Sequence, residues 1–317
     1  AQRISAVDLA EMSLRRLETI GPRLGAVVTV TRERALTQAH RANQELLAGR
    51  DRGLLHGIPY GAKDLLATKG IPTTWGAEPL RGQVFDFDAT VVRRLEEAGA
   101  VLVAKLAMVE LAGRLGYNNP DASFTGPGRT PWNPDYWSGG SSSGPASAVA
   151  AGLVPFAIGS ETSGSILTPA AFCGVTGLRP TYGLVSRHGA MALCWTLDKL
   201  GPLARSADDC APVPAAIAGA DPADPTTGAT FRYRERGTRR GRPGQRFRVG
   251  VLRDATAGSD PDVASNFRQA VSALRDVADV EEDVPFPDLP YREAVGIIVD
   301  AEGAAAFRDL IESGKVK

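Results

Sequence analysis

The chain has 317 residues, enough to bury a large hydrophobic core, and we expect one domain. Its 36 basic and 36 acidic side chains give a formal net charge of zero, which argues against a surface that attracts nucleic acid over its whole extent. No apolar run reaches the ~18–20 residues of a membrane span, and no charged-then-apolar leader is visible. We therefore expect a cytoplasmic protein.

The cysteine pattern argues against both a disulfide framework and a metal site. Cys173, Cys194 and Cys210 are odd in number and lack the spacing of metal ligands. No cluster of metal-ligating residues is apparent elsewhere, and residues 159–165 lack the lysine of a phosphate-binding loop. These features predict buried reduced thiols, no metal and no cofactor.

Two helices can be predicted from their end signals. Residues 5–20 form an apparent helix in which Ser5 is the expected N-cap and Asp8, three residues later, its capping-box partner. Asp88 is expected to cap a second helix, which ends at Gly99.

One lysine lies inside an otherwise apolar, strand-like run. Lys63 falls within residues 54–66, whose sequence is LLHGIPYGAKDLL. Burial drives a lysine toward its neutral form, because the charge is penalised away from water. Lys63 is therefore a candidate proton acceptor, although most lysines in such runs lie at an edge and extend their ammonium group to solvent.

A Gly/Ser-rich turn runs directly into an apolar segment of small residues. Residues 137–152 read WSGGSSSGPASAVAAG, and residues 152–159 read GLVPFAIG. A flexible linker should be flanked by polar sequence, so this pattern predicts a buried helix followed by a buried strand. The hydroxyls of this turn must be hydrogen-bonded, because an unpaired buried hydroxyl costs on the order of 1–3 kcal/mol.

A second hydroxyl-rich turn follows at once. Residues 159–172 read GSETSGSILTPAAF, in which a strand end meets a glycine-containing loop and then a helix with Pro169 near its first turn. Backbone N–H groups at such a helix start can stabilise an oxyanion. With Lys63, the two turns supply a base, a relay hydroxyl, a nucleophile and backbone donors, which are the components of acyl transfer.

The last third of the chain begins with an irregular basic segment. Residues 220–246 are predicted to be an irregular connection, and 232–246 (RYRERGTRRGRPGQR) are its basic part, either a mobile solvated link or a contact for RNA or another polyanion. A strand over 247–252 and an amphipathic helix over 262–277 follow. With a buried strand at 100–104, helices and strands alternate, which indicates α/β architecture around a sheet.

With these motifs in this order, the chain resembles the amidase signature family of serine hydrolases. The resemblance is carried by the segments 57–64 (GIPYGAKD), 139–142 (GGSS) and 159–166 (GSETSGSI). Four further segments match in order and spacing, and weaker similarity covers nearly the whole chain: 69–74, 88–92, 177–183 and 197–202. The resemblance implies a mixed central sheet covered by helices. Family members continue well past the equivalent of Lys317, so the C-terminal part of that fold is expected to be absent.

The resemblance also implies roles for individual residues. It assigns Lys63 as base, Ser141 as relay serine after a cis peptide bond, and Ser165 as nucleophile. Ser142 would be a supporting hydroxyl that ties the relay to its neighbours. The oxyanion donors would be the backbone N–H groups of Thr162, Ser163, Gly164 and Ser165.

Three positions near the nucleophile depart from the family pattern. The family commonly has Gly at Ser163, and often Asp and Arg at Glu161 and Leu167. Because the three triad residues are present, these departures affect the expected substrate preference more than the expected chemistry.

The leading hypothesis is therefore a hydrolase that cleaves small carboxylic amides, or esters or carbamates, through an acyl-enzyme. The alternatives are the amidase subunit of a tRNA-dependent amidotransferase and an inactive binding module. A Ser-His-Asp hydrolase is disfavoured, because the literal GSSSG at 140–144 lacks the preceding strand that a nucleophile elbow requires. We expect no nucleic acid or membrane partner, and a homodimer is left open.

Overall fold

The computed structural model describes residues 4–113, 123–228, 230–232 and 246–315. Their contacts define two compact units, one within Ala1–Tyr233 and Gly296–Lys317 and the other within Arg234–Val295. Most of the predicted basic connection, residues 229 and 233–245, lies outside the described residues. The interpretation of residues 1–317 as one domain stays a prediction.

The first unit is built around a mixed sheet, which confirms the predicted fold class. Within the described residues its six strands lie in the order β1-β3-β2-β4-β6-β5. The central strands β3, β2 and β4 run parallel, whereas β1, β6 and β5 pair antiparallel to their neighbours. The strands are β1 (Val27–Val30), β2 (Pro59–Lys63), β3 (Val101–Leu106), β4 (Phe156–Glu161), β5 (Thr176–Gly177) and β6 (Lys199–Ala204).

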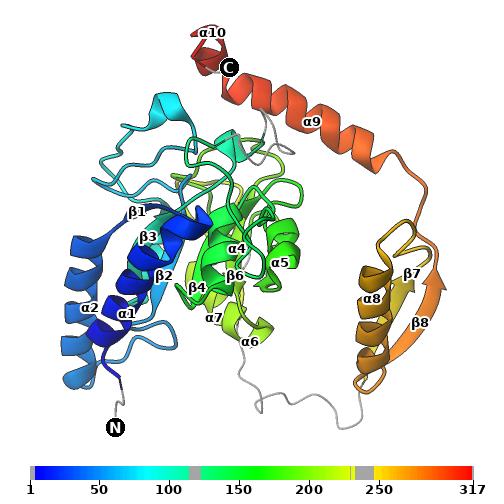
Figure 1. Ribbon diagram of the computed structural model, residues 1–317, viewed down its shortest axis with the longest axis horizontal. Helices are drawn as coiled ribbons and strands as arrows, with labels where there is room; N and C mark the ends of the chain where they lie inside the picture. Colours follow the sequence, from blue (N-terminus) through cyan, green and yellow to red (C-terminus); the bar gives the residue numbers. More distant parts are fainter. Residues whose placement is uncertain (1–3, 114–122, 229, 233–245, 316–317) are drawn as a thin grey trace. The chain divides into compact units, whose positions relative to one another are not determined.

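Both faces of this sheet are covered (Figure 1). Val101 and Val103 of β3 pack into one apolar cluster and Leu102 into another, as strand alternation requires. The first cluster includes residues of α1 (Ala6–Thr19), α2 (Arg32–Leu47), α4 (Ser143–Ala150) and α5 (Leu167–Cys173). The second includes residues of α3 (Thr90–Glu97), α6 (Ala207–Cys210) and α7 (Pro212–Ile217). Three short 3-10 helices complete this unit: η1 (Gly21–Leu24), η2 (Glu78–Leu80) and η3 (Glu110–Gly113).

The predicted helix ends are confirmed in two cases and wrong in one. The hydroxyl of Ser5 accepts from the Asp8 N–H at 3.0 Å and the Asp8 carboxylate accepts from the Ser5 N–H at 3.1 Å, which is the predicted capping box. Gly99 follows α3 with a positive φ of 81°. Asp88 does not cap α3, whose N-cap is Ala89. The carboxylate of Asp88 instead binds the guanidinium of Arg34 at 2.8 Å.

The second unit contains the remaining predicted strand and helix. β7 (Phe247–Leu252) agrees with the prediction and pairs in parallel with β8 (Ala278–Val284). α8 (Pro261–Leu274) is capped by Asp260 and ends before the predicted residue 277. α9 (Tyr291–Ala306) begins in this unit and continues into the first, to which α10 (Arg308–Glu312) belongs. Phe307 packs into the core of the first unit.

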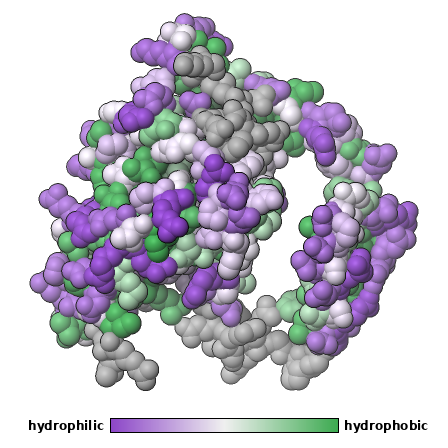
Figure 2. Space-filling model, viewed as in Figure 1, coloured by the Kyte–Doolittle hydropathy of each residue, from purple (hydrophilic) through white to green (hydrophobic). Residues whose placement is uncertain are grey.

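Polar side chains lie on the surface of the chain (Figure 2), whereas its three cysteines are buried. Hydrophilic side chains predominate over α1 and α2 in Figure 2. Cys173, Cys194 and Cys210 are buried free thiols, as predicted. In the described part of the chain, no helix combines the length and apolarity needed to cross a membrane, and no group of three potential side-chain ligands could hold a metal ion.

Candidate active site

Lys63 lies at the end of β2, and its side chain is completely buried. Its Nζ donates to the hydroxyl of Ser141 at 2.7 Å and to that of Ser160 at 2.9 Å. Burial lowers the pKa of Lys63 to about 7, although the carboxylates of Asp198 and Glu161 act in the opposite direction. An ordinary lysine titrates near ~10.4. Lys63 is therefore poised to exchange a proton with a serine hydroxyl near neutral pH.

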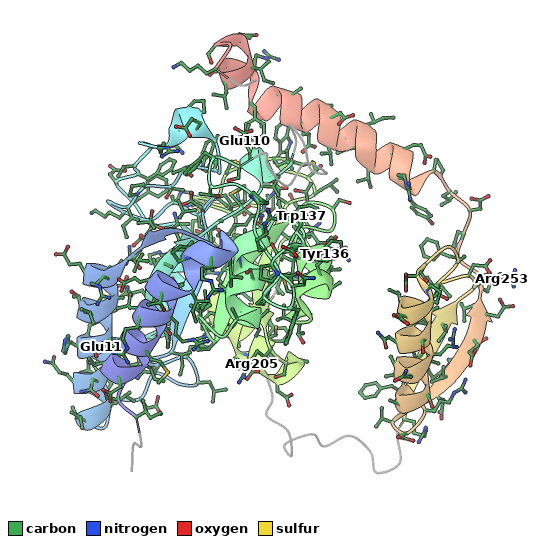
Figure 3. All side chains as sticks on the ribbon, in the orientation of Figure 1. Glu11, Glu110, Tyr136, Trp137, Arg205 and Arg253 are labelled. Atoms are coloured by element: carbon green, nitrogen blue, oxygen red, sulfur yellow. The ribbon has the colours of Figure 1, made fainter. Side chains whose placement is uncertain are left out.

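The turn before α4 places Ser141 against this lysine. The Gly140–Ser141 peptide bond is cis, as predicted. A Cβ on Gly140 would lie 2.6 Å from Cγ2 of Val109 and 2.8 Å from the ring of Trp137, which is labelled in Figure 3. The Ser141 carbonyl accepts from the N–H of Val109 at 3.1 Å. The turn thus needs glycine for space, and its backbone is fixed beside β3.

Ser142 joins the two hydroxyl-rich turns. Its hydroxyl donates to the Ser160 carbonyl at 3.2 Å and accepts from the Ser160 N–H at 3.3 Å. Its own N–H donates to the carbonyl of Ser165 at 3.1 Å. A Cβ on Gly159 would lie 2.8 Å from the Ser142 hydroxyl, so this close approach requires glycine in β4. Ser142 is thus hydrogen-bonded to residues of the second turn, and the supporting role that the resemblance implies for it stays a prediction.

The second turn carries Ser165, which is buried, between β4 and α5. The Glu161 carboxylate accepts from the N–H groups of Ile166 at 2.9 Å and Leu167 at 3.0 Å, and so holds the start of α5. Gly164 has φ +91°, a conformation that favours glycine. Contact between the hydroxyls of Ser165 and Ser141 stays a prediction.

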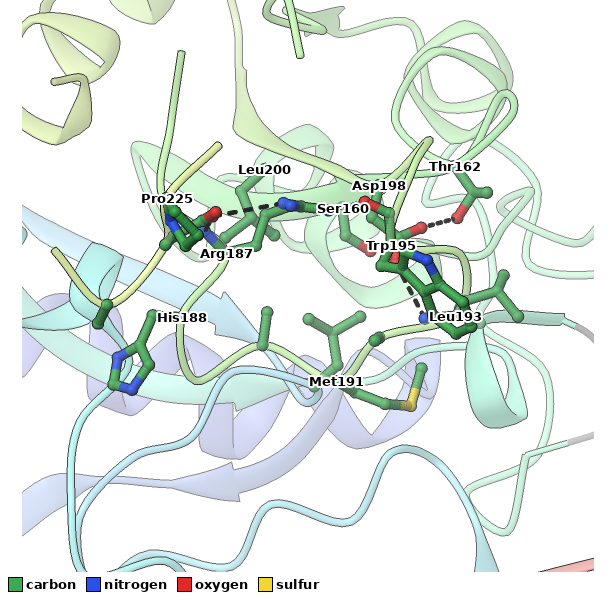
Figure 4. A pocket seen from close by; sticks show the side chains of 16 residues that line it. Ser160, Thr162, Arg187, His188, Met191, Leu193, Trp195, Asp198, Leu200 and Pro225 are labelled. Carbon is green, nitrogen blue, oxygen red and sulfur yellow. Dashed lines mark hydrogen bonds and ion pairs between the residues drawn. The ribbon is translucent and has the colours of Figure 1, made fainter. Parts of the chain in front are cut away.

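A cavity of about 220 Å³ opens beside this turn (Figure 4). Its polar side is formed by Ser160, Thr162 and Asp198, and Met191 and Leu193 contribute apolar surface. The cavity therefore reaches the residues that surround Lys63.

Ser160 and Asp198 were not among the predicted site residues. Ser160 lies in the GSETSGS motif near the end of β4. Because side chains alternate between the two faces of a strand, the motif's own sequence could have suggested that Ser160 shares a face with side chains of the adjacent strand. Asp198 lies in the matched segment 197–202, but it comes near the turn only through the antiparallel pairing of β4 with β6. No local signal reveals that pairing.

His56 and His188 have polar neighbours of their own, and His188 also lines the cavity. The Nε2 atom of His56 lies 3.2 Å from a carboxylate oxygen of Glu45, and the ring of His188 lies 3.5 Å from the hydroxyl of Thr90. These contacts agree with the sequence-based argument against a Ser-His-Asp arrangement.

A mixed sheet that buries a lysine against a serine of a Gly/Ser-rich turn places the chain in the class of α/β proteins with a lysine–serine site. The model of the amidase family matches residues 8–315. The chain therefore belongs to the amidase family, which confirms the resemblance seen in the sequence.

Three relatives illustrate what the chain is similar to. The chain is 40% identical over 308 residues to a glutamyl-tRNA(Gln) amidotransferase subunit from Roseiflexus sp. (strain RS-1), covering 96% of this chain and 61% of that protein. The peptide amidase from Stenotrophomonas maltophilia has a similar structure, with 35% identity, a TM-score of 0.82 and coverage of 99% and 66% of the two chains. The structure of the corresponding glutamyl-tRNA(Gln) amidotransferase subunit from Thermotoga maritima gives 31% identity, a TM-score of 0.76 and coverage of 96% and 64%. The chain thus spans about two thirds or less of the length of these relatives.

Proposed function

We propose that this chain cleaves carboxylic amides by acyl transfer to Ser165. Neutral Lys63 takes the proton of the Ser141 hydroxyl while Ser141 takes that of Ser165, and Ser165 Oγ attacks the carbonyl carbon. The C–N bond then breaks as the amine leaves with a proton returned through the relay. Water attacks the acyl-enzyme and releases the acid. The 2.7 Å contact between buried Lys63 and Ser141 is the observation that carries this proposal.

The turn that holds Ser165 would stabilise the negative charge on the substrate oxygen. The proposed donors are backbone N–H groups, and one such donor is commonly worth about 10²–10³ in rate. They belong to Thr162, Ser163, Gly164 and Ser165. Because the same machinery accepts esters and carbamates, the class of leaving group is left open.

A second candidate is the amidase subunit of a tRNA-dependent amidotransferase, which releases ammonia from glutamine for a partner. It is favoured by the 40% identity to the Roseiflexus amidotransferase subunit, whereas among the solved structures the peptide amidase is the more similar, with 35% identity against 31% for the Thermotoga amidotransferase subunit. Turnover of a small amide or a peptide amide by the isolated chain supports the leading proposal. Release of ammonia from glutamine only with partner proteins and tRNA supports the second.

Covalent labelling tests the chemistry that both candidates share. We expect phenylmethylsulfonyl fluoride to add one label to the wild-type chain, measured by intact mass, and none to Ser165→Ala. The matched control is Ser206→Ala, which removes an exposed hydroxyl that caps α6. Equal labelling of Ser165→Ala and wild type would overturn the assignment. A wild-type chain that neither labels nor turns over amides would indicate a binding module.

A further inference from the structure

Two consecutive residues, Asp198 just before β6 and Lys199 at its first position, hold Thr162 in place. The Thr162 hydroxyl donates to Oδ1 of Asp198 at 2.5 Å, and Nζ of Lys199 donates to the Thr162 carbonyl at 3.0 Å. Lys199 pairs opposite Glu161 in the antiparallel ladder of β4 and β6. The side chain and the backbone of Thr162 are therefore both attached to the same short stretch of the neighbouring strand.

Asp198 is itself fixed by its surroundings. Its Oδ2 accepts from the N–H groups of Leu193 and Cys194, each at 2.9 Å. Although burial raises the pKa of Asp198, all three of these partners donate toward it. A set made only of donors suits a carboxylate, which accepts through both oxygens. Asp198 can thus serve as a rigid anchor for Thr162.

The other end of the same turn is anchored separately. The Glu161 carboxylate holds the N–H groups of Ile166 and Leu167, just after Ser165. The residues between the two anchors, 162–165, are the ones proposed to supply the oxyanion donors. Their orientation is therefore set by contacts from outside the turn.

Because the peptide group is planar, a contact that fixes the Thr162 carbonyl also fixes the direction of the next N–H. The carbonyl of Thr162 and the N–H of Ser163 belong to one planar peptide group, and in a trans peptide they point in opposite directions. When Lys199 holds the carbonyl oxygen on one side, the Ser163 N–H is directed to the other side. A free turn could rotate this peptide and lose the donor.

We propose that Asp198 and Lys199 are positioning residues that clamp the Thr162 peptide and so aim the backbone donors of residues 162–165 at the substrate oxygen. This proposal rests on the proposed function. The clamp acts through hydrogen bonds to Thr162, and neither side chain needs to touch the substrate.

Asp198 has a second, electrostatic effect that can be measured apart from the clamp. The groups facing Lys63 are the hydroxyls of Ser141 and Ser160, and the carboxylates of Asp198 and Glu161 bias its charge. A carboxylate favours the ammonium form, so removing the charge of Asp198 should lower the pKa of Lys63. Since the neutral amine is the active form, the acid side of the pH–rate profile should move to lower pH.

Acylation kinetics of the full chain test both effects. We expect Thr162→Val, which keeps the branched shape but loses the hydroxyl, to acylate about 10- to 100-fold more slowly, because misplaced donors cost rate. Thr162→Ser should restore most of that rate, since it keeps the donor. Asp198→Asn should slow acylation and also move the acid side of the pH–rate profile to lower pH. Lys199→Met should slow acylation. The control is Thr31→Val, which removes a buried hydroxyl that donates to the Leu102 carbonyl at 2.7 Å, far along the chain from the turn.

Wild-type rates in Thr162→Val would overturn the proposal, and a pH–rate profile that does not move in Asp198→Asn would contradict the separate electrostatic effect on Lys63. Hydrogen exchange of the backbone amides separates this outcome from a failure of the proposed function. The clamp predicts faster exchange of the amides of residues 163–165 in Thr162→Val than in Thr162→Ser, whether or not the chain turns over an amide. Equal exchange in the two variants would count against the clamp even in an active enzyme, and Ser165-independent labelling would count against the proposed function alone.

Discussion

Two lysines on neighbouring strands, Lys63 of β2 and Lys105 of β3, are both completely buried but have different partners. Lys105 lies 3.2 Å from the carboxylate of Asp64 and donates to the Leu66 carbonyl and the Thr73 hydroxyl. Lys63 donates to two serine hydroxyls. Burial lowers the pKa of both lysines, but at Lys105 the paired Asp64 acts against this shift. Lys63 can give up its proton without leaving a directly paired carboxylate alone.

The parallel register of β2 and β3 explains why Lys63 and Lys105 have different partners. Ala62 lies opposite Lys105, and Lys63 lies opposite Leu106. Successive side chains of a strand point to opposite faces, so Lys63 is directed away from Lys105. Asp64, although next to Lys63 in the chain, pairs with the other lysine. The fold thereby provides one structural lysine and one candidate base.

The largest expected effect is on the chemistry of Lys63. Lys63→Met keeps most of the side-chain volume but cannot accept a proton, and we expect sulfonylation of Ser165 by phenylmethylsulfonyl fluoride to slow by about 10²–10⁴-fold. Intact-mass kinetics would measure this change. Ser206→Ala provides the matched control. Labelling of Lys63→Met at the wild-type rate would assign the base to another group.

For stability, the comparison of the two lysines predicts a larger loss from Lys105→Met than from Lys63→Met. Lys105→Met leaves Asp64 buried without its partner, and we expect a loss of about 3–5 kcal/mol in the free energy of unfolding, measured with urea. The double variant Asp64→Asn with Lys105→Met should recover part of this loss, because it removes the unpaired charge. A loss for Lys63→Met as large as that for Lys105→Met would erase the proposed distinction.

A smaller effect should follow from removing one of the two hydroxyls that hold Lys63. Ser160→Ala leaves the 2.7 Å contact to Ser141 and removes the 2.9 Å contact. Since one hydrogen bond is worth about 0.5–1.5 kcal/mol, we expect acylation to slow by roughly 2- to 12-fold. Single-turnover labelling kinetics would measure it. A loss as large as that of Lys63→Met would make Ser160, rather than Ser141, the principal relay.

The parts of the fold that were predicted correctly carry their signals locally. Ser5 and Asp8 form a capping box three residues apart, and the run 137–159 combines glycine, serine and small apolar residues in one continuous stretch. The resemblance extended this prediction to a lysine 78 residues before Ser141, and the structure brings the two into contact.

The parts that could not be predicted depend on distant partners. Asp88 has the sequence of an N-cap, but Arg34, 54 residues away, binds its carboxylate. The Asp64–Lys105 pair and the contact of Asp198 with Thr162 each require a strand pairing that no local pattern specifies. The burial and the charged partners of a site residue can therefore be predicted only when the register of the sheet is known.

The pH dependence of acylation tests the central claim, that buried Lys63 is the base, most directly. Burial lowers its pKa to about 7, and the active form is the neutral amine, so the wild-type rate should rise with pH and level off well below the ~10.4 of an ordinary lysine. The rising limb should vanish in Lys63→Met and persist in Lys105→Met wherever that variant is folded. A limb that survives in Lys63→Met, or a wild-type limb centred near the ordinary lysine value, would contradict the account.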